Sequence, residues 1–205
     1  MIVIVDYGMG NLGSIQNMIK KVGSAAIVSS KIEDIEQARK LILPGVGAFD
    51  TGVRNMDRLG LRPALNRKAL KEKTPILGIC LGMHLLTRGS EEGKLPGLGW
   101  IDGETIKFRF EESENHLKVP HMGWNAVQTQ RSHSLFKGLN EEASFYFVHS
   151  YHVVCNTDEQ VLARTRYGYD FASAVQKENI IGVQFHPEKS HRFGMRIIKN
   201  FLESL

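Results

Sequence analysis

The chain has 205 residues with 42% hydrophobic and 23% charged side chains, a composition that suits one globular domain with a sizeable core. Its net charge is +4, but Lys and Arg are scattered, without the basic tail or aromatic-interleaved basic stripe typical of nucleic-acid binding. No apolar stretch approaches the roughly 20 residues needed to cross a bilayer. We therefore expect neither nucleic acid nor a membrane as a partner.

The cysteine content and the N-terminus indicate a cytoplasmic protein. Cys80 and Cys155 are the two cysteines, too few for a disulfide framework in a chain of this length. The apolar run at residues 2–5 is too short for a signal peptide and lacks a basic flank. We expect one domain over residues 1–205 in a reducing cytoplasm, where a free cysteine stays a thiol.

The first half of the chain alternates short apolar strands with helices. Strands are predicted at residues 2–5, 25–28, 41–43 and 75–79, and helices at residues 12–22 and 32–38, after residue 47 to about residue 71, and from residue 80. Strands that alternate with helices form right-handed βαβ units. We therefore predict an α/β fold with an open, mostly parallel sheet that helices cover on both faces.

The second half shows a different pattern. From residue 97 to about residue 175 the sequence has short alternating strands and few helical stretches, which we interpret as an antiparallel extension of the same sheet. A last buried strand is predicted at residues 180–185 and a final helix at about residues 189–202. Helical spacing predicts that this helix packs through Phe193, Ile197, Ile198 and Phe201.

A glycine-rich turn at residues 8–13 fits G-x-G-x-x-G, the pattern that opens the dinucleotide-binding helix of NAD enzymes. Two details count against that reading. The first glycine lies beyond Asp6 and Tyr7 rather than at the strand end, and the second strand ends in Ser29-Ser30, where a ribose-binding acid would be expected. We favour a turn with a surface role, and we expect no cofactor and no metal ion.

The segment around Cys80 carries the most chemical information. A buried strand runs into Cys80 and a helix follows it, while Gly78 and Gly82 remove side chains that would clash in a sharp turn. G-x-C-x-G is the cysteine version of the nucleophile elbow of the α/β-hydrolases. It would lift the thiol to the carboxyl edge of the sheet, at a helix N-terminus that favours the thiolate. The alternative is a buried structural cysteine, a description that suits Cys155 better.

A nucleophilic thiol needs a base, and the base needs an orienting group. His186 and Glu188 follow the last predicted strand and flank Pro187, which fixes the turn. Glu188 would hold the imidazole in the tautomer that accepts the Cys80 proton. The loop at residues 44–47 follows another strand, and its glycines let backbone N–H groups approach a ligand, as in an oxyanion hole. Taken alone, His186 and Glu188 would be read as surface residues and the segment at 44–47 as a plain loop. Together with the Cys80 elbow they predict covalent catalysis by cysteine.

Together these motifs resemble the class I (triad) glutamine amidotransferases, and in finer detail the glutaminase subunit of imidazole glycerol phosphate synthase. The resemblance runs from residue 1 to about residue 202 and implies a flavodoxin-like α/β fold. Its motifs are Asp6-Tyr7-Gly8-Met9-Gly10-Asn11-Leu12, Pro44-Gly45-Val46-Gly47-Ala48-Phe49, Pro120-His121-Met122-Gly123-Trp124-Asn125, Phe145-Tyr146-Phe147-Val148-His149-Ser150-Tyr151 and residues 182–190.

The resemblance also implies a role for each site residue. Cys80 would be the nucleophile, His186 the general acid and base, and Glu188 its orienting partner. The backbone amides of Val46 and Leu81 would form the oxyanion hole. The residues implied to hold glutamine are Gly47, His84, Glu92, Ser150 and Tyr151. The residues implied near the partner-docking face are Asn11 and Trp124.

The implied reaction hydrolyses L-glutamine through a γ-glutamyl thioester on Cys80 and releases ammonia. Because the glutaminase takes up the whole length of the chain, we expect the ammonia acceptor to be a separate protein. In this family the acceptor is a (β/α)8-barrel cyclase, which forms a heterodimer with the glutaminase. The pair makes imidazole glycerol phosphate and an aminoimidazole carboxamide ribotide in histidine biosynthesis.

One position departs from the family pattern. The residue after the elbow that is usually glutamine is here His84, and an imidazole cannot present an amide's donor and acceptor together. Two alternatives remain open. The stretches at residues 167–174 and 190–195 look closer to paralogues that supply ammonia for surface sugars. A regulatory subunit with weak or lost glutaminase activity is the other alternative.

Overall fold

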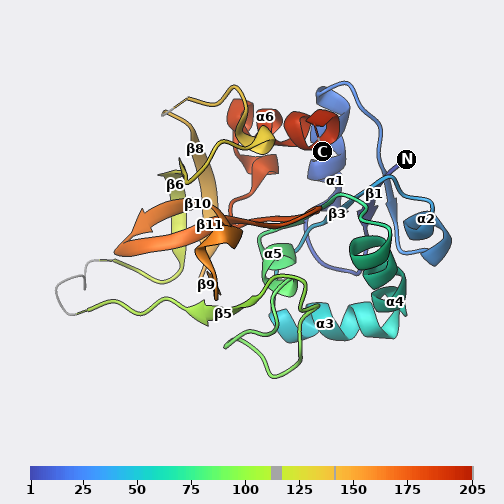
Figure 1. Cartoon of the computed structure of the whole chain (residues 1–205), viewed down its shortest axis with the longest axis horizontal. Helices are drawn as coiled ribbons and strands as arrows, with labels where there is room; N and C mark the ends of the chain where they lie inside the picture. Colours follow the sequence, from blue (N-terminus) through green and yellow to red (C-terminus); the bar gives the residue numbers. More distant parts are fainter. Residues whose placement is uncertain (112–116, 141, 205) are drawn as a thin grey trace.

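A mixed β-sheet runs through the centre of the molecule (Figure 1). The computed structural model describes residues 1–111, 117–140 and 142–204. Within these ranges one sheet has ten strands, and the path through it runs β2-β1-β3-β4-β12-β11-β10-β7. Its parallel half consists of β1 (Ile2–Val5), β2 (Ile27–Ser29), β3 (Lys40–Leu43), β4 (Ile76–Ile79) and β12 (Ile180–Val183). The open α/β sheet predicted from the sequence is confirmed.

Helices cover both faces of this sheet (Figure 1). One face carries α1 (Leu12–Lys21) and α6 (His191–Ser204). The other face carries α2 (Ile32–Glu36), α3 (Phe49–Arg58), α4 (Leu61–Asn66), a π-helical turn (Arg67–Lys71) and α5 (Leu81–Leu85). Successive side chains along each buried strand point to opposite faces of the sheet and pack there. Val3 and Val5 therefore belong to one apolar cluster and Ile4 to the other.

The antiparallel extension begins at β11, which pairs with β12. It consists of β5 (Gly103–Lys107), β7 (Gln128–Thr129), β9 (Tyr151–Cys155), β10 (Val161–Tyr167) and β11 (Tyr169–Lys177). Short 3-10 turns lie at Ser134–Phe136, which follows β7, at Asp158–Gln160, between β9 and β10, and at Pro187–Lys189, between β12 and α6. The predicted extension of the parallel sheet therefore exists, but it does not contain every strand of this region.

Two strands form a separate sheet, which corrects the expectation of one continuous extension. They are β6 (His121–Ala126) and β8 (Ser144–His149), which pair antiparallel with Trp124 opposite Tyr146. The inner face of β8 stacks on the main sheet, with the Phe145 ring 4.1 Å from that of Phe185. Alternating hydrophobicity predicts which face of a strand is buried, but not whether its partner lies beside it or beneath it.

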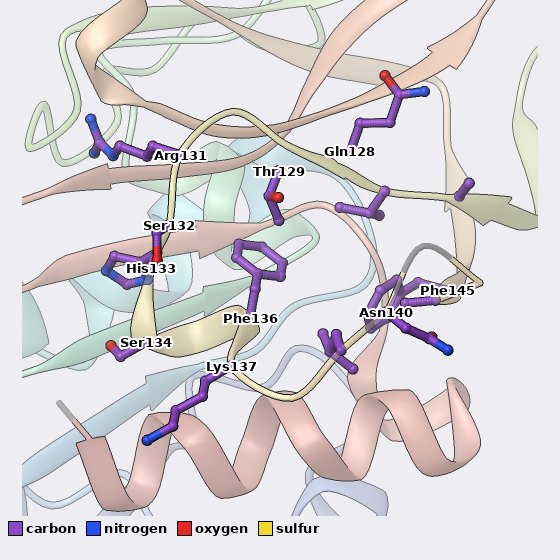
Figure 2. Close-up of a pocket in the computed structure, with 14 residues that line it drawn as sticks. Gln128, Thr129, Arg131, Ser132, His133, Ser134, Phe136, Lys137, Asn140 and Phe145 are labelled. Atoms are coloured by element: carbon purple, nitrogen blue, oxygen red, sulfur yellow. The ribbon is translucent and has the colours of Figure 1, made fainter.

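A hollow of about 900 Å³ is lined by residues between 126 and 145 (Figure 2). The loop that carries the 3-10 turn Ser134–Phe136 arches over it, and Phe136 and Phe145 lie inside the arch. Phe145, at the start of one of the quoted motifs, lines this hollow, but none of the candidate catalytic or glutamine-binding residues does, so this hollow is not the candidate site.

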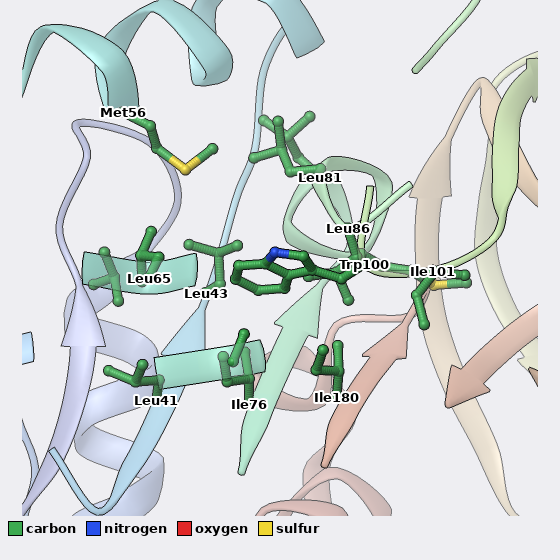
Figure 3. Packing of buried hydrophobic residues seen from close by; sticks show 14 of the residues in the cluster. Leu41, Leu43, Met56, Leu65, Ile76, Leu81, Leu86, Trp100, Ile101 and Ile180 are labelled. Carbon is green, nitrogen blue, oxygen red and sulfur yellow. The ribbon is translucent and has the colours of Figure 1, made fainter. Parts of the chain in front are cut away.

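Tertiary packing holds the short helix α5 in place, since five residues are too few to form a stable helix alone. Trp100 is the central ring of the apolar cluster on this face (Figure 3). Its indole Nε1 donates to Asn66 Oδ1 at 2.8 Å, and its backbone N–H donates to the Leu86 carbonyl at 2.9 Å. The residue that closes α5 is thus tied to the core.

Several predicted boundaries differ from the structure by one or two residues, such as that of β2, which spans Ile27–Ser29 instead of residues 25–28. The last strand ends at Val183 rather than at residue 185, and α6 begins at His191 because Pro187–Lys189 form a 3-10 turn first. The packing face of α6 is confirmed, with Ile197, Ile198 and Phe201 fully buried. No helix in the described residues is long and apolar enough to span a bilayer.

Candidate active site

Cys80 stands at a sharp turn between β4 and α5. Its φ of 53° and ψ of −108° lie outside the regions that side-chain-bearing residues usually adopt. A Cβ on Gly82 would lie 1.8 Å from the Leu43 carbonyl oxygen, and one on Gly78 would lie 2.8 Å from the Gly82 oxygen. The turn therefore requires both glycines, as the elbow motif predicted.

The sheet brings His186 to the same edge as Cys80. Strands β4 and β12 are parallel neighbours with Val183 opposite Ile79, so both chains leave the sheet on the same side. The Cys80 N–H donates to the Val183 carbonyl at 2.8 Å, which fixes the two strand ends together. The carboxyl edge of the sheet thus presents the thiol and the imidazole side by side, where open α/β folds place their sites.

His186 and Glu188 form a buried pair. The imidazole Nδ1 donates to Glu188 Oε1 at 2.7 Å, and the two side chains are 1% and 3% exposed. This bond leaves Nε2 for the thiol, since Nε2 is buried and has no other partner among the described residues. Burial disfavours the charged ring, but the Cys80 sulfur and the Glu188 carboxylate outweigh it and raise the pKa of His186 to about 10. The geometry therefore favours an imidazolium beside the sulfur.

The end of β8 closes the site from the other side. The Val148 carbonyl oxygen lies 4.0 Å from Cys80 Sγ, and the His186 N–H donates to the Tyr146 carbonyl at 2.9 Å. Ser150 and Tyr151 follow immediately along the chain, at the turn from β8 into β9. The structure thus brings these two predicted glutamine-binding residues to the edge that carries Cys80.

The glycine-rich loop after β3 packs against the elbow. The Tyr7 hydroxyl donates to the Pro44 carbonyl, and a Cβ on Gly45 would lie 2.7 Å from Leu81 Cβ. Val46 is 49% exposed, and Gly47 has a φ of +123°. Loop and elbow therefore meet at Leu81, the arrangement that an oxyanion hole from the Val46 and Leu81 amides needs.

Glu92 lies beside this loop, at the start of α3. Its Oε2 accepts the Phe49 N–H at 3.0 Å, a bond to a helix N-terminus. Burial raises the pKa of Glu92 despite that hydrogen bond, and the charge of Asp50 acts in the same direction. The hydrogen bond to Phe49 uses one of the two carboxylate oxygens of Glu92. Since Phe49 is two residues from Gly47 along the chain, this bond holds Glu92 close to the glycine-rich loop.

His84 makes a hydrogen bond that the sequence did not reveal. Its Nε2 is 2.8 Å from Gln184 Oε1, and Gln184 Nε2 is 3.8 Å from Cys80 Sγ. From the resemblance we expected His84 to contact glutamine. In the structure its Nε2 instead bonds to the side chain of Gln184. Gln184 itself escaped the sequence analysis, although a glutamine between Val183 and Phe185 in a buried apolar run is a detectable signal.

Asn11 and Trp124, the two residues expected near a docking face, each contact a residue that lines one surface hollow. Asn11 caps α1, and its Oδ1 accepts the Ser14 N–H at 3.3 Å. Trp124 is 49% exposed and stacks on His191, with ring centroids 5.3 Å apart and planes 3° apart. Ser14, His191 and Glu188 all line a cavity of about 360 Å³. The hollow beside Asn11 and Trp124 therefore reaches Glu188, the expected orienting carboxylate.

The glycine-rich turn at residues 8–13 packs closely against the loop after β3 at its second glycine. A Cβ on Gly10 would lie 3.2 Å from the Gly45 backbone nitrogen, because the oxyanion loop fills that space. Within the described residues, no cluster of three or more His, Cys, Asp or Glu side chains is placed to hold a metal ion.

Comparisons with known proteins agree with this geometry. Residues 3–205 match the family model "Glutamine amidotransferase class-I". The chain is 56% identical over 203 residues to "Imidazole glycerol phosphate synthase subunit HisH 2" of Methanococcus maripaludis, with 99% of each chain covered. It is 50% identical to the protein of the same name in Pseudomonas aeruginosa, again over 99% of each chain. A solved glutamine amidotransferase shares the fold with a TM-score of 0.73 at 22% identity, over 99% of this chain and 98% of that one.

Proposed function

Because this chain belongs to the class-I glutamine amidotransferase family, we propose that Cys80, His186 and Glu188 hydrolyse L-glutamine to glutamate and ammonia. Within the family it is a glutaminase subunit of the HisH type, as in imidazole glycerol phosphate synthase. The observation that carries the catalytic assignment is the buried His186 ring, with Nδ1 bonded to Glu188 and Nε2 left for the thiol.

In the first half of the reaction the Cys80 sulfur attacks the amide carbon of glutamine. The developing oxyanion would accept hydrogen bonds from the backbone amides of Val46 and Leu81, which act when charge develops. The C–N bond then breaks, and the His186 imidazolium gives its Nε2 proton to the departing nitrogen. Ammonia leaves and a γ-glutamyl thioester remains on Cys80.

In the second half His186 is neutral and acts as a base. Its Nε2 takes a proton from water, the hydroxide attacks the thioester, and the C–S bond breaks to release glutamate. Glu188 holds the imidazole in the same tautomer in both halves, through the 2.7 Å bond to Nδ1. The cycle returns the sulfur and the imidazolium to their starting state.

The glutamine would lie between the oxyanion loop and the end of β8. Glu92 accepts the N–H of Phe49, two residues after Gly47, and Ser150 and Tyr151 follow Val148, whose carbonyl oxygen lies 4.0 Å from Cys80 Sγ. A carboxylate such as Glu92 suits the α-ammonium group, while backbone and hydroxyl donors suit the α-carboxylate. These assignments come from the family resemblance, and the contacts of Glu92 and Val148 support them.

We propose that the ammonia goes to a (β/α)8-barrel cyclase in a heterodimer, in the cytoplasm. Ammonia is mostly protonated near neutral pH and then is not nucleophilic, so direct delivery inside a complex preserves it. The docking face would run past Asn11 and Trp124, next to the exposed Met122. Met122 and Trp124 together expose apolar surface on the same strand, and a patch of this kind favours a protein partner.

Glutamate release from glutamine tests this function. The chain is assayed alone and then with its cognate cyclase and that enzyme's ribonucleotide substrate. We expect strong activation by the cyclase and a loss of at least about a thousandfold in Cys80→Ala. Activity that ignores the cyclase would instead indicate another ammonia acceptor, such as a sugar amidotransferase. Activity retained in Cys80→Ala, or absent from the wild type under both conditions, would contradict the proposal.

A further inference from the structure

Gln184 lies between His84 and the nucleophile, entirely buried. It follows β12, and its backbone N–H donates to the Ser173 carbonyl at 2.9 Å, so its main chain is held by β11. Its side chain reaches His84 Nε2 with Oε1 at 2.8 Å and Cys80 Sγ with Nε2 at 3.8 Å. His84 stands one turn after Cys80 on α5 and is 4% exposed. One amide thus bridges an imidazole and the sulfur.

The two ends of an amide are chemically opposite, so its orientation matters for the sulfur. With Nε2 toward Cys80, Gln184 offers a donor to the thiolate; turned over, it would present Oε1 and repel the charge. Shape alone does not select between these orientations, because the oxygen and nitrogen of an amide are nearly equal in size. A third group has to make the choice.

His84 can make that choice in its neutral tautomer with the proton on Nε2. Burial lowers the pKa of His84 to about 4, so at neutral pH one ring nitrogen donates and the other accepts. A proton on Nε2 demands the Gln184 oxygen, and the amide nitrogen must then face Cys80. The 2.8 Å contact is therefore a donor–acceptor bond that sets the far end of the amide.

We propose that His84 is a positioning residue that fixes the amide of Gln184, so that Gln184 Nε2 donates a hydrogen bond to the Cys80 thiolate. The inference rests on the proposed role of Cys80 as nucleophile. It replaces direct glutamine binding as the role of His84 and adds Gln184 to the groups around the sulfur. A histidine at this position is then an adaptation of the site rather than a defect.

The reactivity of the Cys80 thiol toward iodoacetamide tests this without glutamine or a partner. The thiolate displaces iodide and forms a C–S bond, and mass mapping separates Cys80 from Cys155. Burial raises the pKa of Cys155 to about 11, so Cys155 should react slowly. The rate constant is measured at pH 7 on the folded full chain, with folding checked by circular dichroism.

Matched amide substitutions at His84 separate hydrogen bonding from packing. His84→Gln carries its NH₂ about as far as Nε2, whereas the shorter His84→Asn reaches only about as far as Nδ1. We expect His84→Gln to react within about twofold of the wild type, and His84→Asn and His84→Leu about tenfold more slowly, the range of a hydrogen bond to a charged group. Gln184→Leu should be equally slow, and adding His84→Leu to it should cause no further loss.

Either of two results would overturn the proposal: an unchanged rate in His84→Leu and His84→Asn, or equal slowing in His84→Gln. Additive losses in the double variant would do the same, since the two residues would then act separately. Failure of the proposed function would look different. In that case the alkylation pattern would hold while the wild type released no glutamate with or without the cyclase.

Discussion

At the scale of single residues, backbone strain at Cys80 is the feature that most separates this site from an ordinary buried cysteine. A residue with a side chain at φ 53° and ψ −108° stores of order 1–3 kcal/mol of strain, which the surrounding fold has to sustain. The Cys80 N–H bond to Val183 and the contact of Gly82 with Leu43 hold the turn in place. The strain lifts the sulfur out of the sheet and toward His186.

Comparison of Cys80→Gly with Cys80→Ala measures this strain, because both remove the sulfur and differ in backbone freedom. We expect Cys80→Gly to be more stable to urea by about 1–3 kcal/mol, since glycine adopts the turn without strain. The matched control is Cys155, which lies in β9 with an ordinary backbone. There the order should reverse, with Cys155→Ala more stable by about 0.5–1 kcal/mol. Equal stability of the two Cys80 variants would contradict a strained elbow.

The sequence reveals some of these residues and hides others for a physical reason. Cys80, His186 and Glu188 could be predicted because local spacing determines a strand–turn–helix and a turn after a strand. The bond between His84 and Gln184 joins residues 100 positions apart, and no local pattern encodes it. Only the parallel register of β4 with β12 brings them together.

At the scale of elements, the small sheet of β6 and β8 contains a directed chain of hydrogen bonds. His149 Nδ1 donates to the Tyr151 carbonyl at 2.7 Å, because a carbonyl only accepts. The neutral ring then accepts at Nε2, so His121 Nδ1 must be the donor at 3.0 Å. His121 Nε2 in turn accepts from Asn125 Nδ2 at 3.2 Å. These bonds link β6, which carries Trp124, to Tyr151 in the segment proposed to hold glutamine.

Substitution of His121 tests the direction of this chain. His121→Leu would leave His149 Nε2 as a buried acceptor without a donor and should destabilise the fold by about 1–3 kcal/mol. His121→Asn keeps an N–H near the Nδ1 position and should lose less. The unfolding free energy in urea distinguishes them. Equal losses in the two variants would mean that packing against Tyr167 and Phe147 matters more than the hydrogen bond.

The sequence predicted the parallel half of the sheet correctly but not the position of β6 and β8, for a physical reason. The parallel half was correct because βαβ chirality leaves few arrangements for alternating strands and helices. The position of β6 and β8 was wrong because alternation places Phe145 and Phe147 on one face without naming what that face covers. A strand in a layer above a sheet and a strand added at the edge of that sheet show the same alternation of apolar and polar residues.

At the scale of the whole molecule, buried neutral histidines should make stability depend on pH. Burial lowers the pKa values of His84, His121 and His152 to about 4, and that of His149 lies well below its usual value as well. In the unfolded chain these rings titrate near 6.5. Below that pH the unfolded state binds more protons than the native state, so protonation favours unfolding.

His186 acts with the opposite sign. Its pKa of about 10 in the folded chain means that its protonated form stabilises the native state fully below pH 6.5, and that this contribution is lost as the pH rises toward 10. The buried neutral rings contribute stability that is full above pH 6.5 and is lost as the pH falls toward 4. The two effects together place the maximum of stability near pH 6.5.

The melting temperature across pH 5 to 9 measures both limbs. We expect it to fall from pH 6.5 to pH 5. In this range the free energy of unfolding drops with a slope that approaches about 1.4 kcal/mol per pH unit for each ring that stays neutral in the native state. Basic partners lower the pKa values of Glu72, Glu91 and Glu178. The stability that these carboxylates contribute is lost only below about pH 4.5, outside the pH range of this measurement. His186→Gln should flatten the alkaline limb and leave the acidic limb unchanged. A melting temperature that stays constant between pH 6.5 and 5 would show that the buried rings are protonated in the native state.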